Sequence, residues 1–261
     1  MSTALHLLTP TVDQPQKPLL VYLPGMDGSG TLFTTQVPAL HPHFEVRCLA
    51  LPRDDRSSWD RLAAQASDLI TTVATGRRVY LCGESFGACL ALQIAAQAPR
   101  LAHRLILVNP ASAFHRLPWL QWLGQITPWV PSTVFPFSTL GSLPMLANLD
   151  RIAPVEQEQL LQAVQAVPQA TVAWRMGLLA EFQPASLNLS QWTPPTLLVA
   201  SLADRLLPSL DEAQHLADLL PHSQIYPLPY SGHASLLEQN VNLGEILAET
   251  GFLPQPSPVL A

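Results

Sequence analysis

The chain has 261 residues, of which 48% are hydrophobic and only 12% are charged, and its formal net charge is −6. This length and apolar content suit one large α/β domain or two small ones, and we expect one domain with an insertion. The acidic balance provides no basic surface of the kind that nucleic acid requires, so nucleic acid is not an expected partner.

The N-terminal sequence and the cysteines indicate in which cellular compartment the protein is expected. The sequence MSTALHLLTP has neither a basic region nor a long apolar segment, so it predicts no signal peptide or transit peptide, and we expect the mature chain to begin near Met1. Cys48, Cys82 and Cys89 form no C-x-x-C pair and fall inside predicted strands or helices, as buried free thiols do. These features favour a reducing compartment, and we predict a cytoplasmic location.

The first buried strand is predicted at Leu19–Leu23 and leads into a glycine-rich loop, PGMDGSG, at residues 24–30. The G-x-x-G-x-G spacing differs from the dinucleotide motif, and no Lys-Ser/Thr pair indicates a P-loop. The remaining functional interpretation is half of an oxyanion hole, in which the N–H of Met26, or alternatively that of Asp27, faces a reacting oxygen. The simple alternative is a flexible βα loop.

A strand at Phe44–Leu49 and a helix at Trp59–Val73, with Ser58 as N-cap, are predicted next. Strands and helices thus alternate along the chain, as they do in folds with a parallel sheet. A further strand is predicted at Leu105–Val108. This rhythm predicts a mostly parallel sheet with helices on both faces and with its loops gathered at the carboxyl ends of the strands.

The central motif is VYLCGESFGACLALQIAAQ at residues 79–97, a strand, a tight turn and a helix with Ser85 in G-x-S-x-G. A nucleophile on such a turn lies close to neighbouring backbone, so we expect that only glycine fits at Gly83 and Gly87. The helix N-terminus then points at Ser85, and the Phe86 N–H is the predicted second oxyanion donor. The alternative is a serine that only caps an ordinary helix.

The strand rhythm stops between Ala111 and Thr193, and we predict a helical cap insertion at 111–193 within a core formed by 1–110 and 194–261. Leu117–Leu149 has no charged residue, three of the six tryptophans, and five prolines that rule out a membrane-spanning helix. Helices are predicted at Val155–Val167 and Ala170–Phe182.

The insertion has two interpretations. As a cap over the active site, its apolar inner face would bind a hydrophobic substrate, with Trp119 and Trp122 as candidate contacts. Its outer edge would also allow peripheral contact with a membrane. The alternative is that residues 111–193 form a structural insertion that packs around its own hydrophobic core.

The sheet pattern then resumes. A strand at Thr196–Ser201 runs into Asp204, and the last strand, Gln224–Leu228, runs into a turn that contains His233. A helix is predicted between these strands at 209–220, and another from the turn through Ala248. A carboxylate and an imidazole thus follow neighbouring strands on the edge that carries Ser85.

Ser85, Asp204 and His233 occur in the chain order of α/β hydrolases. A serine needs an imidazole to take its proton, and the imidazole needs a carboxylate to hold its tautomer. We therefore predict that His233 accepts from Ser85 and donates to Asp204. The alternative acids are weaker because none of them directly follows a strand; they are Asp150, Asp211 and Glu238.

Several segments also resemble one family. They are PGMDGSG, FEVRCLALPRDDRSSWDRL, VYLCGESFGACLALQIAAQAP, LILVNPASAF, LPMLANL, TLLVASLADRLLPS and SGHASLLEQNVNLGEIL. From about Leu19 to Leu247 the chain resembles the hydrolase-like half of the phytyl ester synthase and diacylglycerol acyltransferase proteins of plastids and cyanobacteria. The resemblance implies an acyl donor, a long-chain alcohol such as phytol or diacylglycerol, and the same three triad positions.

Two features depart from that family. Glu84 stands where the family usually has Asp, and none of the eight histidines is followed by Asp in the His-x4-Asp spacing of the family's acyltransferase domain. We therefore expect a stand-alone α/β-hydrolase domain that hydrolyses lipophilic acyl esters or thioesters without a metal or cofactor. Acyl transfer to a long-chain alcohol is the alternative, and a non-catalytic hydrolase-fold binding protein is a second one.

Overall fold

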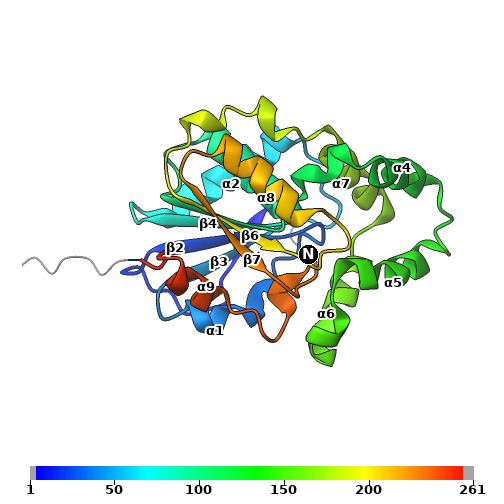
Figure 1. Cartoon of the computed structure of the whole chain (residues 1–261), viewed down its shortest axis with the longest axis horizontal. Helices are drawn as coiled ribbons and strands as arrows, with labels where there is room; N and C mark the ends of the chain where they lie inside the picture. Colours follow the sequence, from blue (N-terminus) through cyan, green and yellow to red (C-terminus); the bar gives the residue numbers. More distant parts are fainter. Residues whose placement is uncertain (1–3, 255–261) are drawn as a thin grey trace, which may run out of the picture.

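The computed structural model describes residues 4–254, and within them the chain is built around a seven-stranded sheet (Figure 1). The strand order is β1-β3-β2-β4-β5-β6-β7, in which β1 pairs antiparallel with β3 and every other neighbouring pair is parallel. The predicted mostly parallel sheet is confirmed, and the short edge strand β1 is an addition to it. The strands are β1 (His6–Leu8), β2 (Leu19–Leu23), β3 (Glu45–Ala50), β4 (Val79–Glu84), β5 (Arg104–Val108), β6 (Thr196–Ser201) and β7 (Ser223–Leu228).

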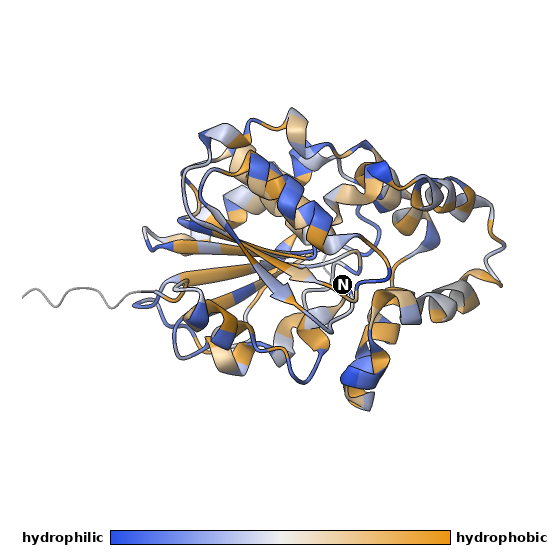
Figure 2. Cartoon of the chain, in the orientation of Figure 1, coloured by the Kyte–Doolittle hydropathy of each residue, from blue (hydrophilic) through white to orange (hydrophobic). Residues whose placement is uncertain are grey.

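Helices cover both faces of the sheet, because the side chains of each strand alternate between two apolar layers. Leu19, Val21 and Leu23 belong to one layer with α2 (Trp59–Ala74), α3 (Phe86–Gln97) and α8 (Ser209–Leu219). Leu20 and Tyr22 belong to the other, with α1 (Val37–Leu40) and α9 (Leu243–Glu249). Figure 1 shows α2 and α8 on one side of the sheet and α1 and α9 on the other. Figure 2 shows the strands mostly in the hydrophobic colour, whereas α8 is divided between hydrophobic and hydrophilic residues.

Residues 111–193 lie between β5 and β6, and Figure 1 shows their helices α4, α5 and α6 grouped at one end of the sheet. Pro118 and Pro154 stand at the first positions of α4 and α6, where proline costs no hydrogen bond. Within the described part of the chain, no helix combines the length and the apolar character that crossing a bilayer requires. The helices of this segment are η2 (Ala111–Arg116), α4 (Pro118–Ile126), η3 (Thr127–Trp129), α5 (Phe135–Leu146), η4 (Leu149–Arg151), α6 (Pro154–Gln165), α7 (Gln169–Glu181), η5 (Pro184–Ser186) and η6 (Leu189–Gln191).

The predicted continuous helix from the His233 turn through Ala248 is wrong. The chain forms a 3-10 turn, η7 (Ser235–Leu237), becomes extended at Glu238, and begins α9 only at Leu243. Here the backbone pairs with another segment instead of continuing a helix: Glu238 forms an antiparallel bridge with Ile152, and the Gln239 N–H donates to the Arg151 carbonyl at 2.9 Å. The buried Glu238 carboxylate accepts the Gly232 N–H at 2.7 Å. Asn242 then caps the new helix by accepting the Glu245 N–H.

Candidate active site

Ser85 occupies a strained turn between β4 and α3. Its φ of 54° lies in the region that non-glycine residues rarely adopt, and its N–H donates to the Val108 carbonyl at 3.0 Å. A Cβ on Gly83 would collide with the backbone of Gly87, and a Cβ on Gly87 would collide with the Leu23 carbonyl. The predicted requirement for glycine at both positions is therefore a consequence of backbone packing around the serine.

The structure brings the three predicted catalytic side chains together. His233 Nε2 lies 2.8 Å from Ser85 Oγ, and His233 Nδ1 lies 2.8 Å from Asp204 Oδ2. Both distances are those of good hydrogen bonds. His233 is 5% exposed, so the imidazole bridges the two groups with almost no competition from solvent. The alternative acid Asp211 lies on α8, and Asp150 lies in η4.

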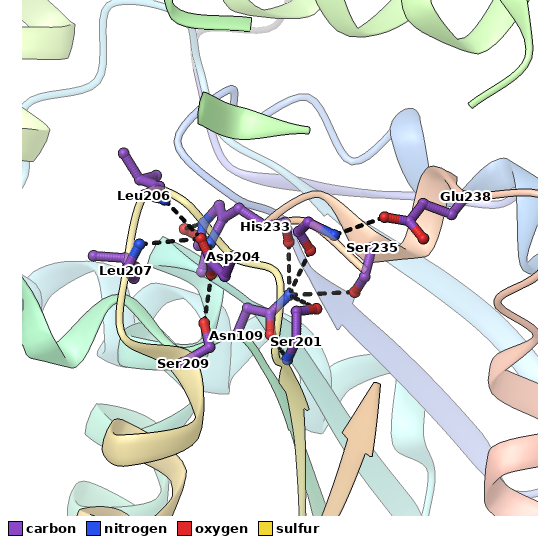
Figure 3. Close-up of polar contacts among 11 residues, drawn as sticks. Asn109, Ser201, Asp204, Leu206, Leu207, Ser209, His233, Ser235 and Glu238 are labelled. Atoms are coloured by element: carbon purple, nitrogen blue, oxygen red, sulfur yellow. Dashed lines mark hydrogen bonds and ion pairs between the residues drawn. The ribbon is translucent and has the colours of Figure 1, made fainter. Parts of the chain in front are cut away.

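Asp204 is held by donors from the loop that follows β6 and from the first residue of α8 (Figure 3). Its Oδ1 accepts the backbone N–H groups of Leu206 at 2.8 Å and Leu207 at 3.0 Å. Its Oδ2, which faces His233, also accepts the Ser209 hydroxyl at 2.5 Å. These donors stabilise the ionised carboxylate and fix its direction.

The loop that carries His233 depends on Asn109, which sequence reasoning missed. Its side-chain amide donates to the His233 carbonyl at 2.7 Å and to Ser201 Oγ at 2.9 Å, and its Oδ1 accepts the Ser201 N–H (Figure 3). Asn109 is fully buried and has a φ of 44°. The only sequence sign was an Asn-Pro pair directly after β5, which by itself indicates a turn.

The glycine-rich loop after β2 lies against the serine. Gly25, Met26 and Asp27 line the same cavity as Ser85, and a Cβ on Gly25 would lie 3.9 Å from Ser85 Cβ. Phe86 is the first residue of α3, and its buried ring stacks on Trp59 at 4.6 Å between centroids. The loop and the helix N-terminus that carry the two predicted oxyanion donors are thus both beside Ser85.

Above Ser85 lies a cavity of about 340 Å³ whose walls are nearly all apolar. The polar residues in its lining are Asp27, Glu84, Ser85 and His233 from the core, and Thr127 and Ser142 from residues 111–193. Of the two predicted cap contacts, Trp119 lines the cavity, whereas Trp122 does not and is 59% exposed. Most of the remaining wall comes from residues 111–193, including Leu120, Leu123, Leu146, Val164, Met176 and Leu179.

In both His233 and Asp204, burial and the charge of the partner shift the pKa in opposite directions. Burial alone lowers the pKa of His233, but the charge and hydrogen bond of Asp204 outweigh it, with a smaller contribution from Glu84, and the net shift is upward. Burial alone raises the pKa of Asp204, but His233 and the Ser209 hydroxyl bring it below its ordinary value. Each group therefore stabilises the charged form of the other.

Glu84 is a second carboxyl next to the serine. It lines the cavity and accepts the Tyr22 hydroxyl at 2.5 Å. Burial raises the pKa of Glu84 to about 7, although the hydrogen bond from Tyr22 and the charge of His233 act against that rise. This side chain titrates in the same pH range as an imidazole.

The thiols are separate from this chemistry. Cys48, Cys82 and Cys89 are free and buried, and burial raises the pKa of each thiol. Among residues 4–254, no group of three or more His, Cys, Asp or Glu side chains is arranged to hold a metal ion.

Comparison with known families identifies the chain's relationship. The family model described as serine aminopeptidase, S33 matches residues 53–240. The chain belongs to this family. The matched region includes the serine turn, residues 111–193, Asp204 and His233. Among solved structures, the S33-family chain is similar to MGS-M2, an α/β hydrolase from a Medee basin deep-sea metagenome, with a TM-score of 0.79 at 17% identity over 98% of this chain and 97% of that one. The expected α/β-hydrolase fold is confirmed.

Two kinds of curated relative differ in the chemistry that their names describe. Phytyl ester synthase 1 of Arabidopsis thaliana is 31% identical over 90% of this chain, which spans 37% of that protein. The chain spans a similar share, 38%, of phytyl ester synthase 2, and the resemblance noted from the sequence is confirmed. The putative carbamate hydrolase RutD of Stutzerimonas stutzeri is 27% identical, with 90% of this chain and 92% of that protein covered.

Proposed function

We propose that this S33-family hydrolase is a serine esterase that cleaves lipophilic acyl esters or thioesters through an acyl-enzyme on Ser85. The observation that carries the proposal is that Ser85 and His233 of the Ser85–His233–Asp204 hydrogen-bond chain line a cavity whose walls are nearly all apolar. A reactive serine under an apolar wall suits a substrate with a carbonyl at one end and a hydrocarbon chain at the other.

The first half-reaction forms the acyl-enzyme. Ser85 Oγ attacks the ester carbonyl while His233 Nε2 takes the hydroxyl proton, and Asp204 stabilises the resulting imidazolium. The Met26 and Phe86 N–H groups hold the oxyanion. The tetrahedral intermediate then collapses, and His233 gives its proton to the departing alcohol. In the second half-reaction a water attacks the acyl-enzyme with His233 as base, which releases the acid and restores the serine.

The cavity supports a lipophilic acyl group over a small polar substrate such as a carbamate. A carbamate would leave most of the apolar wall unused, whereas each additional buried CH₂ of an acyl chain contributes about 0.8 kcal/mol of binding. Medium and long acyl chains are therefore the expected substrates. Trp122 and Trp129, 59% and 85% exposed on the outside of the cap, support a peripheral lipid contact through which such substrates arrive.

Acyl transfer is the second candidate, and the similarity to the phytyl ester synthases favours it. The chemistry shares the acyl-enzyme and differs only in the acceptor, which would be a long-chain alcohol in place of water. Phytol or diacylglycerol is the acceptor class that the resemblance suggests.

Two assays test these proposals. Labelling by a fluorophosphonate probe, lost in Ser85→Ala, distinguishes an enzyme from a non-catalytic binding protein. A panel of esters from acetyl to long-chain acyl groups, run with and without a long-chain alcohol, then gives the substrate and the acceptor. Rapid cleavage of carbamates with slow cleavage of every acyl ester would contradict the lipophilic assignment.

A further inference from the structure

Arg175 is a buried cation that the cap inserts next to the glycine-rich loop. It lies on α7 and is 1% exposed. Its guanidinium donates to the Met26 carbonyl at 2.6 Å and to the Pro52 carbonyl at 3.3 Å. Burying a guanidinium costs desolvation free energy, and these hydrogen bonds to main-chain oxygens offset part of that cost.

The loop is shaped around this guanidinium. Gly28 has a φ of 66°, and a Cβ there would lie 2.8 Å from Arg175 Nη1. Burial lowers the pKa of Arg175, and the charges of Asp27 and Asp55 act against that fall without reversing it. The side chain thus has acidic neighbours, but its hydrogen bonds to Met26 and Pro52 go to backbone.

Arg175 also contacts the side chain of Phe86, the residue whose N–H is the second predicted oxyanion donor. Its guanidinium carbon lies 5.9 Å from the centre of the Phe86 ring, within the range of a cation–π contact. One cap side chain therefore contacts both Met26 and Phe86, whose backbone N–H groups would receive the oxyanion. These donors stabilise a transition state only if they are held about 2.7–3.1 Å from the position that its oxyanion occupies.

We infer that Arg175 is a positioning residue that assembles the oxyanion hole, so that docking of cap helix α7 completes the catalytic site. By holding the Met26 carbonyl it fixes the Met26–Asp27 peptide, and through it the direction of the Met26 N–H on the preceding peptide. The inference rests on the proposed acyl-enzyme chemistry. It assigns the cap a second task besides lining the acyl cavity, because α7 holds the part of the site that interacts with the transition state.

The test compares Arg175→Ala and Arg175→Lys with Arg116→Lys. Arg116 is a matched control because it also joins residues 111–193 to the core, through Glu212 on α8. Each variant is assayed for kcat and KM on one long-chain ester. Each is also titrated with two ketones of the same chain length: a trifluoromethyl ketone, which forms a tetrahedral adduct on serine, and a methyl ketone, which mimics the bound substrate.

We expect kcat of Arg175→Ala to fall on the order of 10²-fold with KM nearly unchanged, as for the loss of an oxyanion donor. Affinity for the trifluoromethyl ketone should fall in parallel, and affinity for the methyl ketone should not. Arg175→Lys, which keeps one donor and the charge, should lie between Arg175→Ala and the unchanged chain. Guanidinium chloride below denaturing concentration should restore part of the Arg175→Ala rate, whereas equal sodium chloride should not. Arg116→Lys should match the unchanged chain.

The outcomes separate the alternatives. Equal losses for both ketones would mean that Arg175 only shapes the cavity, and an unchanged kcat in Arg175→Lys and Arg175→Ala would mean that it has no role; either result overturns the inference. Where Arg175→Ala does not fold in a thermal melt, the Arg175→Lys ketone comparison decides alone. Turnover that survives Ser85→Ala would instead refute the proposed function, whatever Arg175 does.

Discussion

The sheet core and the cap use apolar side chains in different ways. In the core, strands such as β2 and β4 bury nearly every residue between two helical layers, and hydrophobic burial there stabilises the fold. In the cap, apolar side chains line a cavity, while Trp129 and Phe137, 85% and 72% exposed, face outward. The cap is joined to the core partly by polar contacts, among them Arg175 to Met26 and Arg151 to Glu238. Under the proposed function, the core supplies the reacting groups, and residues 111–193 supply the acyl cavity and the side chain that positions the oxyanion loop.

The largest effects should come from the reacting groups of the core. Ser85→Ala should reduce kcat by about 10⁶-fold, because the nucleophile is lost, and His233→Ala should be comparably damaging. The measurement is ester turnover by purified protein whose thermal melt matches that of the unchanged chain. Near-normal turnover by a folded Ser85→Ala chain would refute the nucleophile assignment.

Asp204→Asn should cost less, on the order of 10⁴-fold in kcat, because the imidazole survives in the wrong tautomer. Asp150→Asn is the matched control, since Asp150 lies in η4 of the cap and should leave kcat unchanged. A sensitive Asp150 together with an insensitive Asp204 would transfer the acid role to the cap.

Chain-length preference tests the cap's contribution. Because each buried CH₂ contributes about 0.8 kcal/mol, kcat/KM should rise on the order of tenfold for every two methylenes until the cavity is full. Trp119→Ser should change the preferred chain length, since Trp119 lines the cavity, and Trp122→Ser should not. The same shift in both variants, or acetate as the best ester, would refute a cap-lined acyl site.

The pH dependence tests how Glu84 acts on His233. His233 must be neutral to accept the Ser85 proton, so kcat/KM should rise with pH, and the raised pKa places the midpoint above the ordinary imidazole value. Glu84→Gln removes a negative charge that raises the pKa of His233, so its midpoint should lie at lower pH. An unchanged midpoint would mean that the Glu84 charge does not reach the imidazole.

Glu84→Gln should also change stability in one direction. The folded state raises the pKa of Glu84 from 4.5 to about 7, so it favours the protonated form, and that contribution to stability is lost as the pH rises through about 7. The glutamine is neutral throughout. The Tm of Glu84→Gln, relative to that of the unchanged chain, should therefore be higher at pH 8 than at pH 5. Thermal melts of both proteins at the two pH values measure this difference.

The smallest effect concerns the outer surface of the cap. Changing Trp122 and Trp129 to serine together should weaken sedimentation with lipid vesicles several-fold and leave turnover of soluble esters unchanged, because neither side chain lines the cavity. If the double variant and the unchanged protein bound vesicles equally, the proposed membrane contact would be refuted.

The sequence predicted the elements whose causes are local. Leu19–Leu23 and Thr196–Ser201 are strands with the predicted bounds, and α2 begins after Ser58, whose hydroxyl accepts the Arg61 N–H. Each depends on apolar runs, caps and turn residues within a few positions. The positions of Ser85, Asp204 and His233 followed from topology, since parallel strands deliver their carboxyl ends to one edge.

The rest depended on contacts between distant segments. The sequence predicts Glu238 as a helix residue and a poor acid candidate, whereas the structure buries it against Gly232 and Arg151, where the predicted helix is interrupted. Asn109 and Arg175 support the site through backbone carbonyls far away in the chain, and no local pattern distinguishes them from other polar residues. Trp122 shares the uncharged segment with Trp119, but only the helix orientation decides which of the two faces the cavity.

The most direct test of the central claim is mass spectrometry of the protein quenched with acid during turnover of a long-chain ester. The account predicts that the protein gains the mass of one acyl group, that the modified peptide contains Ser85, and that Ser85→Ala gains nothing. Steady turnover with no covalent adduct on rapid quenching, or an acyl group on another residue, would contradict the acyl-enzyme mechanism on Ser85.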